Sequence, residues 1–150
     1  MSALNETKIY LTIPADAAYI DIVRLTLYGV ASKAGFSYEE MEDMKVAVSE
    51  ACTNAVLHAY NDCHNGIIDI SFTLEDNSMH ISIKDYGSSF KYEQNVVSTA
   101  AHHDKPLEEI AAGGLGIFMM QALMDSVKVC SDLGTEIILI KRMGGNEDSI

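Results

Sequence analysis

The strongest constraint on the fold of this chain is a strict alternation of apolar and polar side chains over residues 68–83. The apolar positions are Ile68, Ile70, Phe72, Leu74, Met79, Ile81 and Ile83. A period of two predicts half-buried strands, and the polar turn at residues 75–78 joins them into a hairpin. One face of this hairpin is apolar, so a second layer of structure must cover it.

Two helices precede the hairpin and can supply that layer. The first is expected over residues 15–34, between Pro14 and Gly35, with apolar side chains at helical spacing. The second begins at the capping box Ser37–Glu40 and runs to about Tyr60.

The rest of the chain adds strands, a short helix and a long loop. Strands are expected at residues 8–13, around 127–129 and at 135–141, and a helix at 117–124. Residues of about 86–113 are predicted to form a lid, and residues 144–150 a frayed tail. The elements together predict one α+β domain over residues 1–150. It is a two-layer sandwich with helices on one face of a mixed, mostly antiparallel sheet.

Charge and composition narrow the partners. The net charge is −12, which argues against direct binding of nucleic acid and against docking on anionic membranes, and suits a basic protein partner. The N-terminus lacks the pattern of a signal peptide, no window is long enough to span a membrane, and the three cysteines have unrelated spacings. These features predict a cytoplasmic protein.

Glu50 and Asn54 lie four residues apart on the second helix, and therefore on one helix face. A carboxamide oxygen is a ligand that magnesium accepts, and a nearby carboxylate can take a proton from a hydroxyl group. Taken alone, the pair is better explained as part of the solvated face of an amphipathic helix.

Two further patterns are each open to a plain structural explanation. Asp85 and Gly87 end a strand, where a carboxylate can accept a hydrogen bond from an exocyclic amine, but an ordinary turn fits as well. Residues 113–116, Gly-Gly-Leu-Gly, open a helix whose backbone amides can bind phosphate, but a flexible loop fits equally. The order and separation of these patterns are more specific than any one of them.

In that order, Glu50 with Asn54, Asp85 with Gly87, a long lid and the glycines of residues 113–116 resemble the ATP-binding signature of the GHKL superfamily. Within it, the chain is similar to the bacterial anti-sigma-factor serine kinases, and most similar to those that control a sigma-B type stress factor. The matching segments are residues 24–27, 29–32, 41–48, 46–56, 58–60, 113–116 and 123–125. The resemblance runs from about residue 8 to residue 142.

The resemblance implies the GHKL (Bergerat) ATP-binding fold and a set of roles at the nucleotide. Asn54 would coordinate the Mg²⁺ that bridges the phosphates of ATP, and Glu50 would be the general base. Asp85 would hold the adenine amino group with the support of Thr135, and Gly87 would let the ring approach.

It also implies a phosphate site and partners. Gly113, Gly114, Leu115 and Gly116 would shape the end of the lid around the phosphates, and Arg24 would contact the protein partners. These partners would be a sigma factor and an anti-anti-sigma factor, the latter phosphorylated on a serine, and the kinase would be a homodimer.

The chain departs from the superfamily pattern at two places. Ser88 and Ser89 follow Gly87 where a second glycine is usual, and Ala111 and Ala112 stand where related kinases carry an arginine. A cation that assists phosphoryl transfer is therefore not identified by the sequence. Two alternatives remain at this stage: a nucleotide-gated sigma-binding protein without kinase activity, and an ATPase of the same superfamily.

Overall fold

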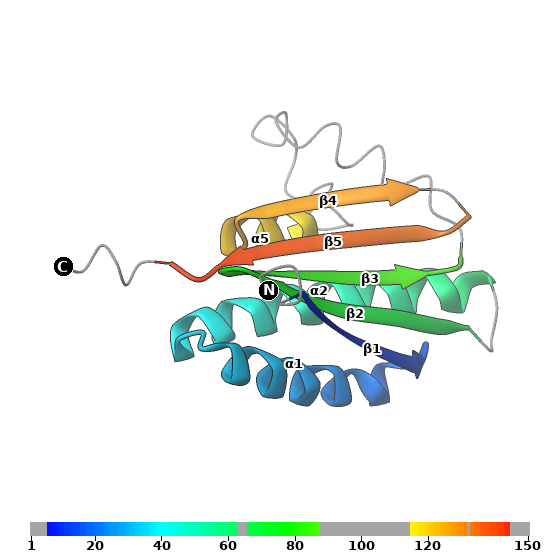
Figure 1. The fold of residues 1–150 in the computed structure, drawn as a ribbon. Coiled ribbons are helices and arrows are strands. Elements are labelled where there is room, and N and C mark those ends of the chain that lie inside the picture. The colour runs from blue at the N-terminus through cyan, green and yellow to red at the C-terminus, as the bar shows by residue number, and fades with distance from the viewer. Residues whose placement is uncertain (1–5, 63–65, 88–114, 132, 145–150) are drawn as a thin grey trace, which may run out of the picture.

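The structure is a computed structural model that describes residues 6–62, 66–87, 115–131 and 133–144 (Figure 1). In chain order the elements are β1 (Thr7–Pro14), the 3-10 helix η2 (Ala17–Tyr19), α1 (Ile20–Ala34), α2 (Tyr38–Asp62), β2 (Ile67–Glu75), β3 (Ser78–Asp85), α5 (Leu115–Leu123), β4 (Ser126–Ser131) and β5 (Thr135–Arg142). The five strands form one sheet in the order β1-β2-β3-β5-β4.

All four pairings between the described strands are antiparallel. The expected sheet was mixed, and the difference has a simple cause. β3 and β4 run in the same direction, but β5 lies between them and pairs with both. Strands that run in the same direction, such as β3 and β4, are therefore never neighbours in the sheet.

The helices cover one face of this sheet, as the alternation in the hairpin predicts (Figure 1). Most apolar positions of β2 and β3, among them Phe72 and Ile81, are fully buried on the side of α1 and α2, and Leu74 is partly buried. The alternate positions point to the opposite face, which no described helix covers and which is lined mainly by polar side chains. The α+β two-layer sandwich predicted from the sequence is confirmed.

The helix starts follow local capping chemistry. At α2 the expected capping box is confirmed: the Ser37 backbone N–H donates to Glu40 at 2.8 Å, and the Glu40 N–H donates to the Ser37 hydroxyl at 3.1 Å. At α1 the chain first forms the 3-10 turn η2, capped by Asp16, so the α-helix begins five residues later than predicted, at Ile20. Within the described residues, no helix is long and apolar enough to cross a membrane.

Most of the predicted lid, residues 88–113, and nearly all of the predicted tail, residues 145–150, lie outside the described residues. The extent of a single domain over residues 1–150 likewise stays a prediction.

Candidate functional site

One end of the sheet carries a buried polar pair. Asp85, the last residue of β3, lies directly opposite Thr135, the first residue of β5. Both continue the buried positions of their strands and are therefore on the face that the helices cover; their exposed fractions are 2% and 1%. The Thr135 hydroxyl is buried and has no hydrogen-bond partner among the described residues. A buried hydroxyl of this kind is costly unless a ligand or water completes it.

The turn after β3 is tightly constrained. The Gly87 backbone N–H donates to Asp85 Oδ1 at 2.9 Å, which closes the turn. On the β5 side, Gly134 has a φ of +119° and lies so close that a Cβ there would be 2.2 Å from the Asp85 carbonyl oxygen. Only glycine has both the backbone freedom and the missing side chain that this approach requires.

Glu50 and Asn54 lie on α2, as predicted, and the start of α5 packs against both. A Cβ added at Gly116 would be 3.2 Å from Asn54 Nδ2 and 3.2 Å from Glu50 Oε1. Gly116 is thus brought beside the predicted metal ligand and the predicted base. Gly113 and Gly114 lie outside the described residues, and Leu115 is described only as the first residue of α5.

The elements that carry the predicted site residues pack against one another. β3 ends and β5 begins at one end of the sheet, and the C-terminal half of α2 runs behind them (Figure 1). α2 packs against β3, β5 and α5. α2, which carries Glu50 and Asn54, therefore packs against each of the elements that carry Asp85, Thr135 and Gly116.

The side chains present fit a magnesium ion that a nucleotide brings with it. Asn54 Nδ2 is buried without a hydrogen-bond partner in the part of the chain that the structure describes. The same carboxamide offers an oxygen, the ligand type that magnesium prefers. No cluster of three or more His, Cys, Asp or Glu side chains suited to a metal occurs within residues 6–62, 66–87, 115–131 and 133–144. A single carboxamide suits an ion that takes its other ligands from phosphates and water.

Arg24 is tied to the helix that carries the site. Its Nε donates to the Ser49 hydroxyl at 2.8 Å, which links α1 to α2 one residue before Glu50. The neighbouring Cys52 is fully buried, and burial raises the pKa of its thiol to about 12, against a smaller opposing effect of Arg24. Cys52 is therefore protonated at neutral pH and is a packing residue rather than a nucleophile.

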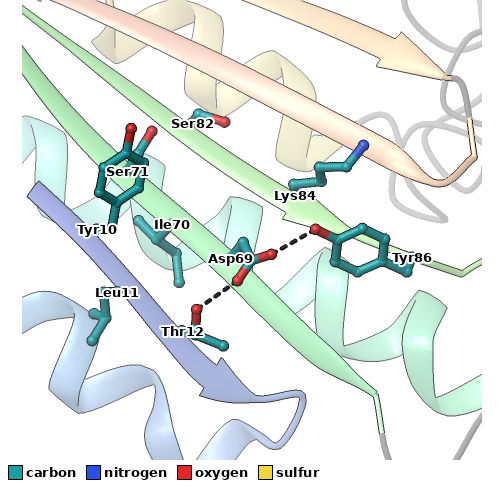
Figure 2. A pocket seen from close by; sticks show the side chains of 9 residues that line it. All are labelled: Tyr10, Leu11, Thr12, Asp69, Ile70, Ser71, Ser82, Lys84 and Tyr86. Atoms are coloured by element: carbon teal, nitrogen blue, oxygen red, sulfur yellow. Dashed lines mark hydrogen bonds between the residues drawn. The ribbon is translucent and has the colours of Figure 1, made fainter. Parts of the chain in front are cut away.

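Two residues near the site were not predicted from the sequence. The signal that Gly134 is constrained, a glycine directly before Thr135, is too common to stand alone. Tyr86 lies between Asp85 and Gly87, and no pattern in the sequence marks it. Its side chain points to the open face of the sheet, where its hydroxyl donates to Asp69 at 2.5 Å (Figure 2).

Comparison with known proteins identifies the family. The family described as histidine kinase-like ATPase domain matches residues 13–141. The chain therefore belongs to the histidine kinase-like ATPase domain family.

Among the curated proteins similar to this chain are several named serine-protein kinase RsbW. The protein of that name from Oceanobacillus iheyensis is 44% identical over 95% of this chain and 91% of its own length. The one from Bacillus subtilis is 39% identical over 94% of this chain and 89% of its own length. These similarities place the chain in an enzyme class, the ATP-dependent protein kinases.

A solved structure supports the fold. The RsbU and RsbW domains of Rv1364c from Mycobacterium tuberculosis match with a TM-score of 0.67 and 21% identity, over 91% of this chain. The match spans 32% of that longer chain. At this identity the likeness is one of fold.

Proposed function

We propose that this chain is a cytoplasmic anti-sigma factor and serine-protein kinase. It binds a stress sigma factor of the sigma-B type. It uses Mg-ATP to phosphorylate a serine of an anti-anti-sigma protein, which then loses its hold on the kinase. The observation that carries the proposal is the buried pair Asp85 and Thr135, in which the Thr135 hydroxyl has no described partner, on the two strands against which α2, the helix that carries Glu50 and Asn54, packs.

Asp85 and Thr135 form the adenine end of the proposed site. A buried carboxylate can accept a hydrogen bond from the exocyclic amine of adenine, and the unpartnered Thr135 hydroxyl can bond the ring directly or through a water. Gly87 follows without a side chain, so the flat ring can approach the backbone. Adenine would thus supply a partner for the buried Thr135 hydroxyl, which has none among the described residues.

Glu50 and Asn54 form the reacting end. Bound Mg²⁺ supplies charge neutralisation on the phosphates. Asn54 offers its carboxamide oxygen to hold the ion, and Glu50 accepts the proton of the serine hydroxyl as it attacks. Gly116, beside both side chains, and Gly113, Gly114 and Leu115 before it give the phosphates access to backbone amides at the start of α5.

Arg24 is the proposed contact for both protein partners, on α1. Because its Nε is bonded to Ser49, a partner that engages the guanidinium also acts on the α2 turn that carries Glu50. The net charge of −12 favours a partner with a basic surface. We propose that the active form is a homodimer, as the resemblance implies.

The decisive experiment is phosphoryl transfer. The purified chain is incubated with labelled ATP, Mg²⁺ and the anti-anti-sigma partner, and label on a serine of the partner is the expected result. If the partner binds stably but stays unlabelled in a single-turnover assay, the chain has no kinase activity toward it. It would favour a nucleotide-gated binding protein instead.

Asn54→Ala is expected to weaken Mg-ADP binding by about tenfold or more, because it removes the proposed metal ligand. The nucleotide-free protein should keep its thermal stability, since the buried Asn54 Nδ2 has no described partner to lose. The measurement is the rise in Tm on adding Mg-ADP, compared with the rise in wild type. An unchanged rise would remove Asn54 from the metal site.

The association rate with the sigma factor is expected to fall steeply with salt, by about one to two orders of magnitude, if opposite charges steer the encounter. Stopped-flow measurements over a range of NaCl concentrations test this, with the dissociation rate as the internal control. A rate that is independent of salt would rule out charge steering.

A further inference from the structure

The turn that carries Asp85 and Gly87 is held by a hydrogen bond on the open face of the sheet, the face away from the helices. Asp85 faces the helices, and the next side chain, Tyr86, faces away from them (Figure 2). The Tyr86 ring is 51% exposed, yet its hydroxyl donates to Asp69 Oδ2 on β2 at 2.5 Å. The hydrogen bond from Tyr86 to Asp69 is therefore a tether between the turn after β3 and strand β2.

The acceptor of this tether is itself held in place. Thr12 on β1 donates to Asp69 Oδ1 at 2.6 Å, so the two carboxylate oxygens have one donor each. Thr12, Asp69 and Lys84 lie side by side in the register of β1, β2 and β3. The Lys84 ammonium stands 5.3 Å from the centre of the Tyr86 ring. Three strands therefore determine where Tyr86 lies.

The hydroxyl is a donor throughout the physiological range. The hydrogen bond to Asp69 raises the pKa of Tyr86 above its usual value, and burial and the charges of Asp69 and Glu136 act in the same direction. Hydrogen bonds to a carboxylate are shorter and stronger than neutral ones. The tether thus persists wherever the nucleotide site is expected to work.

Tyr86 and Gly134 act on the same short turn from different sides. Gly134 packs against the Asp85 carbonyl and the Tyr86 Cα, and the Tyr86 side chain pulls the turn toward Asp69. Together they hold the turn in one conformation before the nucleotide binds. Ordering the turn therefore does not reduce the free energy of binding.

We infer that Tyr86 is a positioning residue of the nucleotide site, with Asp69 as its anchor, and that the pair preorganises Asp85 and Gly87 for the adenine ring. This inference rests on the proposed function. The tether on the open face of the sheet contributes both to the affinity for the nucleotide and to the selectivity for adenine.

The test compares Tyr86→Phe with Tyr10→Phe in the full chain. Tyr10 is a matched control, because it also lies on the open face and also has a lysine, Lys8, over its ring. We expect Tyr86→Phe to raise the Kd for Mg-ADP and the KM for ATP by about tenfold, and to narrow the preference for ADP over GDP. The value of kcat should change by less than about twofold, because binding rather than the transition state is affected. Tyr10→Phe should match wild type in all four quantities.

A double-mutant cycle with Asp69→Ala separates the tether from general loosening of the sheet. If the two side chains act as one unit, the double variant should bind Mg-ADP no more weakly than the weaker single variant. Additive losses, an unchanged preference for ADP over GDP, or equal effects of Tyr86→Phe and Tyr10→Phe would overturn the inference.

Asp85→Asn distinguishes failure of this inference from failure of the proposed function. If Asp85→Asn loses Mg-ADP while Tyr86→Phe binds it as wild type does, the tether is wrong and the adenine site stands. If Asp85→Asn binds as wild type does, the adenine site itself is wrong, and the tether falls with it.

Discussion

Glu50→Gln should abolish phosphoryl transfer while leaving the nucleotide bound. The substitution keeps the size of the side chain and its place on α2 beside Gly116, but a carboxamide cannot accept the serine proton. General-base catalysis typically contributes about 10²–10⁴-fold in rate, which is the loss expected in a single-turnover assay with the protein substrate. The Kd for Mg-ADP should stay within about twofold of wild type, because binding of the ground state does not use the base.

Glu39→Gln is the matched control for this experiment. It makes the same chemical change on the same helix, at an exposed position in the first turn of α2. Its transfer rate should equal that of wild type. Transfer by Glu50→Gln at the wild-type rate would show that Glu50 is not the base. A parallel loss of Mg-ADP binding would assign Glu50 to binding instead.

Gly134→Ala should lower the free energy of unfolding more than an alanine at either Gly29 or Gly35. The new Cβ would meet the Asp85 carbonyl oxygen at 2.2 Å and the Tyr86 Cα at 2.9 Å, and the φ of +119° disfavours any side chain. Strain of this kind costs about 1–3 kcal/mol, and overpacking costs about as much again. The two together predict a loss of roughly 2–6 kcal/mol of unfolding free energy. Nucleotide binding should be lost as well, since Asp85 must move.

Two other glycines separate the cost of the positive φ from the cost of the close approach to Asp85. Gly35 also has a positive φ, of +103°, but the space around it is open, with the Met143 sulfur at 3.9 Å. Gly29 lies inside α1, and no described atom would come within 4 Å of its Cβ. The expected order of stability in urea unfolding is Gly29→Ala, then Gly35→Ala, then Gly134→Ala. If Gly134→Ala is as stable as Gly35→Ala, the close approach to Asp85 does not constrain the turn.

Local patterns were sufficient to predict the elements of this fold. The alternation that ends at Ile83 predicted the hairpin, and Ser37 with Glu40 predicted the start of α2, because each depends on neighbours in sequence. The start of α1 was placed too early, because the 3-10 turn capped by Asp16 uses the same residue types as a helix. Local chemistry distinguishes these two kinds of turn poorly.

The order of the strands and the geometry of the site depend on contacts that spacing does not encode. No pattern in the sequence states that β5 inserts between β3 and β4, and so none states that Asp85 lies opposite Thr135. Their association was inferred from a resemblance to known ATP sites, and their roles remain proposals. The tether of Tyr86 to Asp69 arises from cross-strand register, which only the assembled sheet defines.

The position of β5 in the sheet also affects when the fold can be completed during synthesis. Of the five strands, β5 emerges last from the ribosome, yet it belongs to the interior of the sheet. Until residues 135–142 have been released, β3 has an unpaired edge and Asp85 has no threonine opposite it. A nascent chain therefore lacks half of the proposed adenine site, and its open β3 edge can pair with other chains. If Asp85 and Thr135 hold adenine as proposed, nucleotide can bind only after residues 135–142 have joined the sheet.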